Sequence, residues 1–305
     1  MIFKDLLGND AVKSLLTSSL QKNTLPNTLL FHGMKGIGKS RFAEALAKAL
    51  LSTSKKLENH PDLHIYQPEG KTHLHSIASM RALSEEVFSS PFESKRKVFI
   101  LHEADRMLPA AANALLKTLE EPLLDTTIIL LSSEPDKLLP TILSRCTKFT
   151  FAPLSEDAIQ SHLKEYPHAK ELSRLSSGSL GFALHLANDP TYAEKRELLI
   201  DLLTKRSIHS HADLWQKCEK LQSFYEEKSL EEEPYDLIFS QILLWFRDLE
   251  MKEIPGFTPH FPESVQFSPK LPFAKVQKLL DDAKTASQRG IKLSVCLEYL
   301  FMKTV

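Results

Sequence analysis

The sequence contains few cysteines and no long apolar run. The cysteines lie far apart and form no CxxC pair: Cys146, Cys218 and Cys296. This pattern gives neither a disulfide framework nor a cysteine zinc site, and it is typical of a reducing compartment. No apolar run approaches the ~18 residues that span a membrane, and the first residues, MIFKDLLGND, form no apolar signal segment. We therefore expect a cytoplasmic protein that has no membrane partner.

The chain also lacks a large net charge of either sign. Its 305 residues carry a formal charge of −1, and 25% of them are charged. This balance neither requires nor excludes contact with nucleic acid, because a basic face can be cancelled elsewhere on the molecule. The length exceeds that of a typical single domain, which predicts two or three domains.

The first half of the chain alternates short apolar runs with helical spacing. Such alternation is typical of a parallel sheet that is covered by helices on both faces. The apolar runs predict strands at 28–33, 98–101, 126–131 and 148–151. The helical spacing predicts helices at 10–20, with Asp10 as the cap, and at 41–51, 109–121 and 139–145.

After Pro153 the sequence has helical patterns and no convincing strand pattern. A small helical unit, which begins with the capped helix 155–166 and contains Gly178 and Gly181, ends near Pro190. Longer helices are predicted at 193–204, 212–227, 235–252 and 273–289. The proline-rich stretch 254–272 between the last two predicts an extended, mobile loop, whose role the sequence does not reveal.

A phosphate-binding motif follows the first predicted strand. Residues 33–40 read GMKGIGKS, which is a complete G-x-x-x-x-G-K-[ST] motif between a strand and a helix. The glycines let backbone N–H groups surround phosphate oxygens, and the start of the next helix favours an anion. Lys39 reaches the terminal phosphates and the Ser40 hydroxyl ligates Mg²⁺. The motif predicts that ATP or ADP binds with Mg²⁺ at Gly33, Gly36, Ile37, Gly38, Lys39 and Ser40.

A second buried strand ends in acidic residues, in the stretch VFILHEADRM at 98–107. Nucleotide-hydrolysing proteins usually have Asp and then Glu at this point, but here His102 precedes Glu103. Imidazole is a poor ligand for Mg²⁺, which prefers oxygen donors. Asp105 lies past the strand end and cannot simply take over. The stretch favours a protein that holds a nucleotide without hydrolysing it, and slow residual hydrolysis stays the alternative.

Arg145 lies in the sequence SRC, between a predicted helix and a predicted strand. A surface arginine often pairs with an acidic residue of its own chain. Its planar guanidinium also suits phosphate, and such an arginine can act across a subunit interface on a neighbour's nucleotide. The motif alone leaves both roles open.

Taken in order, six stretches resemble the AAA+ subunits of the bacterial replicative clamp loader. They are FKDLLGND, LPNTLLFHGMKGIGKS, VFILHEADRM, AANALLKTLEEP, LLSSEPDKLLPTILSRC and GSLGFAL, and they cover roughly residues 3–186. Beyond them the resemblance rests on helical content and length. It implies an α/β AAA+ P-loop domain at 1–153, a helical lid at 154–190 and an all-α collar for oligomerisation at 191–305.

The resemblance also implies partners and residue roles. The partners are the gamma/tau and delta subunits in a hetero-pentamer, and the sliding clamp and primed DNA through that complex, within the DNA polymerase III holoenzyme. By position, Glu103 matches the catalytic glutamate, Ser133 the sensor and Arg145 an arginine finger offered in trans, while Leu7 and Gly8 fall at the adenine pocket.

Three departures from the family pattern are informative, and the first two, with SRC retained, predict a stator, which supplies a finger but does not itself hydrolyse ATP. His102 replaces the aspartate of active motor subunits, so Glu103 is expected to be vestigial. Gly181 stands in the motif where motor subunits carry a sensor arginine. Residues 50–98 contain no cysteine, whereas many relatives insert a four-cysteine zinc module there. We therefore expect no zinc, although the histidines at 60, 64, 73 and 75 include an HLH spacing that could bind a metal.

Two other functions are weighed against this one. The first is an ATP-hydrolysing motor subunit of the gamma/tau type, with Glu103 and a rearranged magnesium site. Gly181 and the lack of a long tail argue against it. The second is a small-molecule kinase, which is disfavoured because AANALLKTLEEP and SRC would have no role in one.

Overall fold

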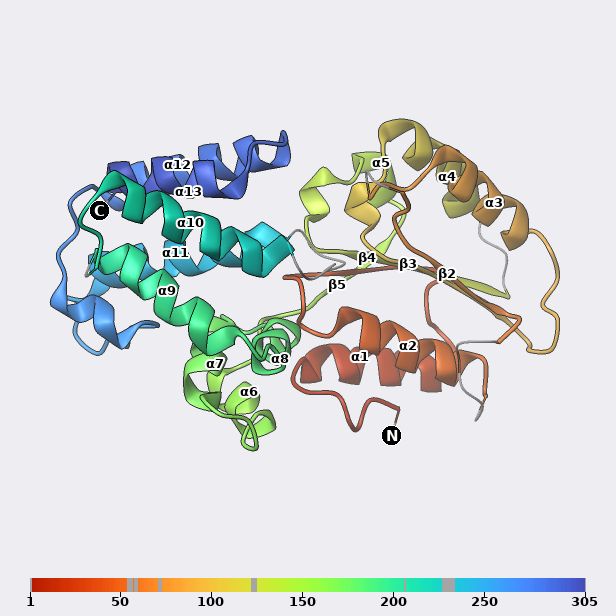
Figure 1. Cartoon of the computed structure of the whole chain (residues 1–305). Coiled ribbons are helices and arrows are strands. Elements are labelled where there is room, and N and C mark those ends of the chain that lie inside the picture. Colours follow the sequence, from red (N-terminus) through yellow and green to blue (C-terminus); the bar gives the residue numbers. More distant parts are fainter. Residues whose placement is uncertain are drawn as a thin grey trace. The chain divides into compact units, whose positions relative to one another are not determined.

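The computed structural model describes residues 2–53, 57, 60–70, 73–121, 125–205, 207–226 and 234–304 (Figure 1). The contacts between residues divide the chain into two units. The first holds the chain up to Leu163 together with Ser176–Ala183, and the second holds Lys164–Leu175 and the chain from Leu184 onward. The residues predicted for the lid are thus shared between the two units, and the three-domain division stays a prediction.

The first unit is built on a five-stranded sheet in the order β2-β3-β4-β1-β5. Every pairing between neighbouring strands is parallel. All residues of β3 and β4 are buried, as expected where helices cover both faces of a parallel sheet. The strands are β1 (Thr28–His32), β2 (Leu63–Tyr66), β3 (Lys97–Leu101), β4 (Thr126–Ser132) and β5 (Thr147–Thr150).

Helices cover the sheet on both faces, which confirms the predicted α/β class. α1 (Asp10–Gln21) and α2 (Lys39–Leu50) lie below the sheet in Figure 1, and α3 (Ile77–Val87), α4 (Pro109–Glu120) and α5 (Pro140–Leu143) lie above it. Each face has its own apolar core. The lower core contains a group of aromatic rings, Phe31, Phe42, Phe149 and Phe151.

Three features of this unit differ from the sequence prediction. β2 and α3 were not predicted. For β2 the reason is that LHIY, at the sheet edge, has no fully buried residue and gives only a weak apolar signal. The predicted Asp10 cap is wrong. Asp10 is the first helical residue, and Asn9 before it has φ 53° with no capping side-chain bond. The Asn9 side chain instead accepts a hydrogen bond from Ala152 N–H at 2.7 Å.

Short helices follow the sheet. α6 (Glu156–His162) begins after Ser155, whose side chain accepts a hydrogen bond from Ala158 N–H at 3.3 Å, so that the predicted cap is confirmed. α7 (Ala169–Leu175) and α8 (Leu180–Ala187) come next.

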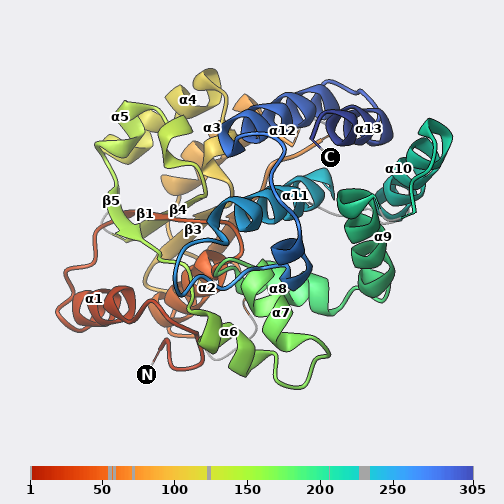
Figure 2. The same cartoon turned by 90° about the vertical axis from the view of Figure 1, so that its left-hand side faces the viewer.

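The second unit is helical in the part of the chain that the structure describes (Figure 2). α10 contacts α9 and α13, and α12 contacts α11 and α13. The last of these helices, α13, was not predicted. The long helices are α9 (Tyr192–Thr204), α10 (His211–Glu226), α11 (Pro234–Met251), α12 (Phe273–Gln288) and α13 (Leu293–Thr304). Glu227, the predicted end of α10, lies outside the described residues. Among those described, no helix has the length and apolar character needed to cross a membrane.

The segment 254–272 is a loop, as predicted, but it is not extended throughout, and its mobility stays a prediction. The segment forms a short 3-10 helix, η4 (Pro262–Gln266), and buries Phe261 against Trp245 of α11, with ring centroids 5.7 Å apart. Asp248 of α11 is fully buried and accepts hydrogen bonds from Phe261 N–H at 2.7 Å and from His260 Nδ1 at 2.8 Å. The proline-rich segment is therefore part of the core of the helical unit.

We predict that Phe261→Ala lowers the free energy of unfolding of the helical unit by about 3–5 kcal/mol, because it removes a buried ring and leaves a cavity. The matched control is Val265→Ala in the same segment. Val265 is 51% exposed, so its loss should cost no more than about 0.5 kcal/mol. Both tryptophans, Trp215 and Trp245, lie in this unit, so urea unfolding followed by tryptophan fluorescence measures it directly. Equal, small losses for both variants would contradict the anchoring of this segment.

Candidate nucleotide-binding site

The carboxyl ends of the parallel strands bring three predicted site segments to one edge of the sheet. The phosphate-binding loop follows β1, the HEAD stretch (102–105) follows β3, and Ser133 follows β4. Because the strands are parallel, these segments meet although they are far apart in sequence. This edge is the common binding site of open α/β sheets.

The phosphate-binding loop has the backbone that its motif requires. Gly33, Gly36 and Gly38 have φ of 144°, 75° and 100°, values that favour glycine. α2 begins directly at Lys39, so the free N–H groups of its first turn border the loop. Ile37 is buried and packs into the lower core of the sheet. The residues present therefore fit a phosphate group.

The side chain of Lys39 lies along this loop. Its ammonium donates hydrogen bonds to the carbonyl oxygens of Gly33 at 2.6 Å and Met34 at 2.9 Å. Burial lowers the pKa of Lys39 to about 8, while the carboxylates of Asp105 and Glu103 act in the opposite direction. The P-loop lysine and the acidic residues after β3 are thus close enough to interact.

The HEAD stretch does not present an acidic pair to the loop. Burial lowers the pKa of His102, so its imidazole is neutral at pH 7. Its backbone carbonyl accepts a hydrogen bond from Nε2 of the buried His75 at 2.7 Å. Glu103 has φ 46°, and its carboxylate pairs with Arg106 Nε at 2.6 Å. The position that would hold Mg²⁺ carries a neutral ring, and the neighbouring carboxylate already has a cationic partner.

Asp105 connects the HEAD stretch to the end of β4. A single oxygen of its carboxylate accepts the Ser132 hydroxyl at 2.6 Å and the Ser133 N–H at 3.0 Å. Ser133 was predicted as the sensor, but the hydroxyl that takes part in this network belongs to Ser132. Sequence reasoning missed Ser132, which reads there only as the end of an apolar strand.

The start of α8 packs directly on the phosphate-binding loop. Gly181 N–H donates a hydrogen bond to the Gly36 carbonyl at 2.8 Å. A Cβ at Gly181 would lie 3.0 Å from Gly36 Cα, and a Cβ at Gly36 would lie 2.1 Å from the Ser179 hydroxyl. In the sequence, Gly181 was notable only because motor subunits carry an arginine in this motif. In the structure, the absence of a side chain at Gly181 also permits the close approach of α8 to the loop.

Leu7 and Gly8, predicted at the adenine pocket, lie before α1. Leu7 is half-buried. Gly8 has φ 60°, and a Cβ there would lie 2.4 Å from the Leu154 side chain. Their role in binding adenine stays a prediction.

Arg145 lies at the opposite edge of the sheet. It precedes β5, whose first residue, Thr147, pairs with Leu29 near the start of β1. A groove of about 560 Å³ at this edge is lined by Pro26, Asn27, Thr28, Leu119, Glu120, Ser144, Arg145 and Thr147. Thr28 opens β1 and Gly33 follows its end. At about 3.3 Å per residue, the two edges are roughly 16 Å apart.

No metal site emerges from the predicted histidines. His60 pairs with Glu93 at 3.3 Å, and His75 donates to His102. Within the described ranges, no group of three or more His, Cys, Asp or Glu is arranged to hold a metal ion. Ser40, half-buried in the first turn of α2, is the residue that would ligate Mg²⁺ bound with a nucleotide.

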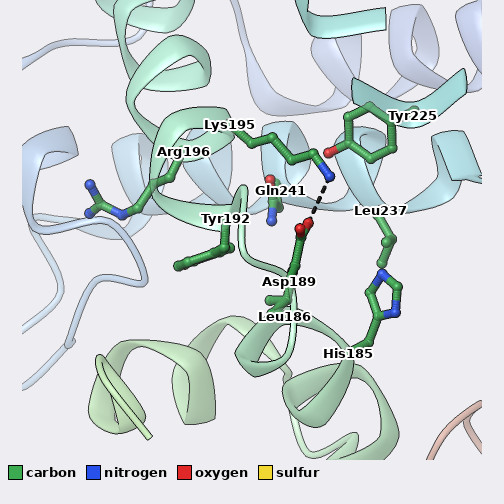
Figure 3. Close-up of a pocket in the computed structure, with 9 residues that line it drawn as sticks. All are labelled: His185, Leu186, Asp189, Tyr192, Lys195, Arg196, Tyr225, Leu237 and Gln241. Carbon is green, nitrogen blue, oxygen red and sulfur yellow. Dashed lines mark hydrogen bonds and ion pairs between the residues drawn. The ribbon is translucent and has the colours of Figure 1, made fainter. Parts of the chain in front are cut away.

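A small cavity in the helical unit is not a nucleotide site. It has a volume of about 20 Å³, which is room for about one water molecule. Figure 3 shows the ion pair between Lys195 Nζ and Asp189 Oδ2, at 2.7 Å, in its wall. The other polar residues of the lining are His185, Tyr192, Arg196, Tyr225 and Gln241. The ion pair is largely buried, with 11% of the Lys195 side chain and 7% of the Asp189 side chain exposed.

Comparison with known proteins places this geometry in a family. The family model described as DNA polymerase III, delta subunit matches residues 8–155. The DNA polymerase III subunit delta' of Bacillus subtilis is 35% identical over 261 residues, which are 78% of this chain and 76% of that protein. The gamma/tau subunit of Mycoplasma pneumoniae is 32% identical over 190 residues, which are 58% of this chain but 28% of that protein.

A solved structure extends the similarity to nearly the whole chain. A DNA polymerase III gamma-subunit-related protein from Thermotoga maritima aligns with a TM-score of 0.53 and 19% identity, over 95% of this chain and 97% of that one. This similarity shows a common fold. The matched sequence, the five-stranded parallel sheet and the phosphate-binding loop agree, and the chain belongs to the DNA polymerase III delta' subunit family of AAA+ clamp-loader proteins.

Proposed function

We propose that this clamp-loader subunit is a largely non-hydrolysing stator. It holds ATP or ADP without rapid turnover, and it supplies Arg145 to the nucleotide of an adjacent subunit. Its partners are the gamma/tau and delta subunits of a hetero-pentamer, which places the sliding clamp on primed DNA. Contact with DNA occurs through the assembled ring, by phosphate contacts without reading the bases.

The separation of the two sheet edges carries this proposal. Arg145 lies at the amino edge and the phosphate-binding loop at the carboxyl edge, about 16 Å away along β1. An arginine side chain cannot bridge that distance to its own nucleotide. The Arg145 side chain is 31% exposed and lines an open groove, so the nucleotide it can contact belongs to another chain.

Three features support weak or absent hydrolysis. His102 replaces the magnesium-binding acid, the Glu103 carboxylate is paired with Arg106, and Gly181 leaves no cation at the lid position. One observation favours a motor subunit instead. The carboxylate of Asp105, which follows β3, acts to raise the pKa of Lys39, so an acidic group does lie near the phosphate-binding lysine. No feature of the described residues favours a small-molecule kinase.

We predict that the isolated protein binds ATP or ADP but does not hydrolyse ATP at ~1 per second or more, the usual enzymatic range. The measurement is steady-state phosphate release, with Lys39→Ala as the control for contaminating activity. Turnover in that range, lost in Lys39→Ala, would support the motor reading instead.

We also predict that nucleotide affinity falls with rising pH. The free protein holds Lys39 with a pKa of about 8, and a phosphate favours the charged ammonium, so binding above pH 8 must take up a proton. The affinity for ADP should fall about tenfold between pH 7 and pH 9. Titration calorimetry of the wild type against Lys39→Met tests this, because the variant should bind weakly and with little dependence on pH. An unchanged wild-type affinity over that range would contradict the prediction.

The decisive prediction compares Arg145→Ala with Lys39→Ala in the clamp loader reconstituted with its host's gamma/tau and delta subunits. Arg145→Ala should lower ATP turnover at the one interface it serves by ~10³, while this subunit's own nucleotide binding stays unchanged. Arg145→Lys keeps the charge but not the planar fork, and it should fail as well. Lys39→Ala should do much less. If Lys39→Ala disables loading and Arg145→Ala is harmless, the motor reading replaces the stator.

A further inference from the structure

Arg145 is held in place by groups of its own chain. Its Nη1 donates to the carbonyl oxygen of Thr141 at 2.8 Å and to the Ser144 hydroxyl at 3.2 Å. Its Nη2 donates to Glu120 Oε1 at 2.5 Å. Thr141 and Ser144 are neighbours in the α5 turn, whereas Glu120 is the last residue of α4. Glu120 therefore makes the contact that joins the guanidinium to a second structural element.

These contacts occupy only part of the guanidinium. It has five N–H groups in a fixed plane, and the bonds above use both of Nη1 and one of Nη2. The buried Nε finds no hydrogen-bond partner among the described residues. Glu120 contacts Arg145 through one carboxylate oxygen. The pair is therefore not a bidentate ion pair, which would use two N–H groups of the guanidinium.

The groove beside this pair suits an anionic ligand. Its wall carries the hydroxyl-bearing residues Thr28, Ser144 and Thr147 beside Arg145. Thr28 is 5% exposed, and its hydroxyl has no partner within the described part of the chain. The Thr28 hydroxyl is itself buried, so the partly used guanidinium of Arg145 is the group that can meet an anion in this groove.

We propose that Glu120 is a positioning residue for Arg145, which holds the guanidinium in the groove before a neighbour's nucleotide arrives. The proposal rests on the stator function. A long arginine side chain has many rotamers, and ordering it costs conformational entropy. If the side chain is already fixed, this cost does not add to the barrier of the reaction that it assists. Glu120 itself does not touch the nucleotide.

The competing explanation is a surface ion pair without a role. Exposed pairs often contribute little, and the Glu120 side chain is 47% exposed. A second competing effect has the opposite sign. A carboxylate that merely competed with phosphate for Arg145 would slow the reaction, and its removal would speed it up.

The test uses the reconstituted clamp loader, with ATP turnover measured in the presence of clamp and primed DNA. The variants are Glu120→Ala and Glu120→Gln, each in wild-type and Arg145→Ala backgrounds. Glu121→Ala is the matched control, because Glu121 is adjacent, exposed and carries the same charge. Thermal unfolding and gel filtration confirm folding and assembly.

We expect Glu120→Ala to lower kcat about tenfold at the interface served by Arg145, with KM changed less than about twofold. Glu120→Gln keeps an oxygen acceptor and should be intermediate, and Glu121→Ala should have no effect. In the Arg145→Ala background, Glu120→Ala should cause no further loss, because the two residues act as one unit.

A loss in Arg145→Ala together with an unchanged or faster Glu120→Ala overturns this proposal and leaves the stator function intact. A Glu120→Ala loss of equal size in both backgrounds also overturns it, since the effect would not pass through Arg145. A harmless Arg145→Ala overturns both proposals.

Discussion

Backbone hydrogen bonds hold β1 between two parallel neighbours, and the positions of the charged groups depend on this arrangement. β4 pairs on one side and β5 on the other, both in the same direction as β1. The segments that leave the carboxyl ends carry Lys39, Glu103 and Asp105. The segment that enters β5 carries Arg145. One strand thus keeps Lys39 and Arg145 on opposite edges of the sheet, where neither side chain can replace the other.

The fold could be predicted where burial is simple. β1, β3 and β4 are buried on both faces and read as continuous apolar runs. β2 lies at the edge and has no such run. α13 was missed for a different reason. It buries Leu297 and Leu300 on one side but exposes Val295, Tyr299 and Met302 on the other, so apolar residues occur all around the helix and its periodicity is blurred.

The candidate site also has parts that the sequence predicts and parts that it does not. The phosphate-binding loop is eight consecutive residues, so its chemistry is legible in the sequence. The contacts that hold the other site residues cannot be predicted in this way, because they join residues far apart along the chain. Examples are Asp105 with Ser132 and Arg145 with Glu120. Periodicity and spacing carry no information on such pairs. The buried Asp248 shows the same limit in the helical unit, where its bond to Phe261 N–H turns a proline-rich stretch into core.

The contact between Gly36 and Gly181 limits which residues position 181 can hold. The resemblance to motor subunits places an arginine where this chain has Gly181. A side chain at that point would begin with a Cβ 3.0 Å from Gly36 Cα and 3.2 Å from the Gly36 carbonyl oxygen. Replacing Gly181 by arginine would therefore require the backbone at Gly36 to shift by a few tenths of an ångström. The packing of α8 on the phosphate-binding loop and the identity of residue 181 therefore constrain each other.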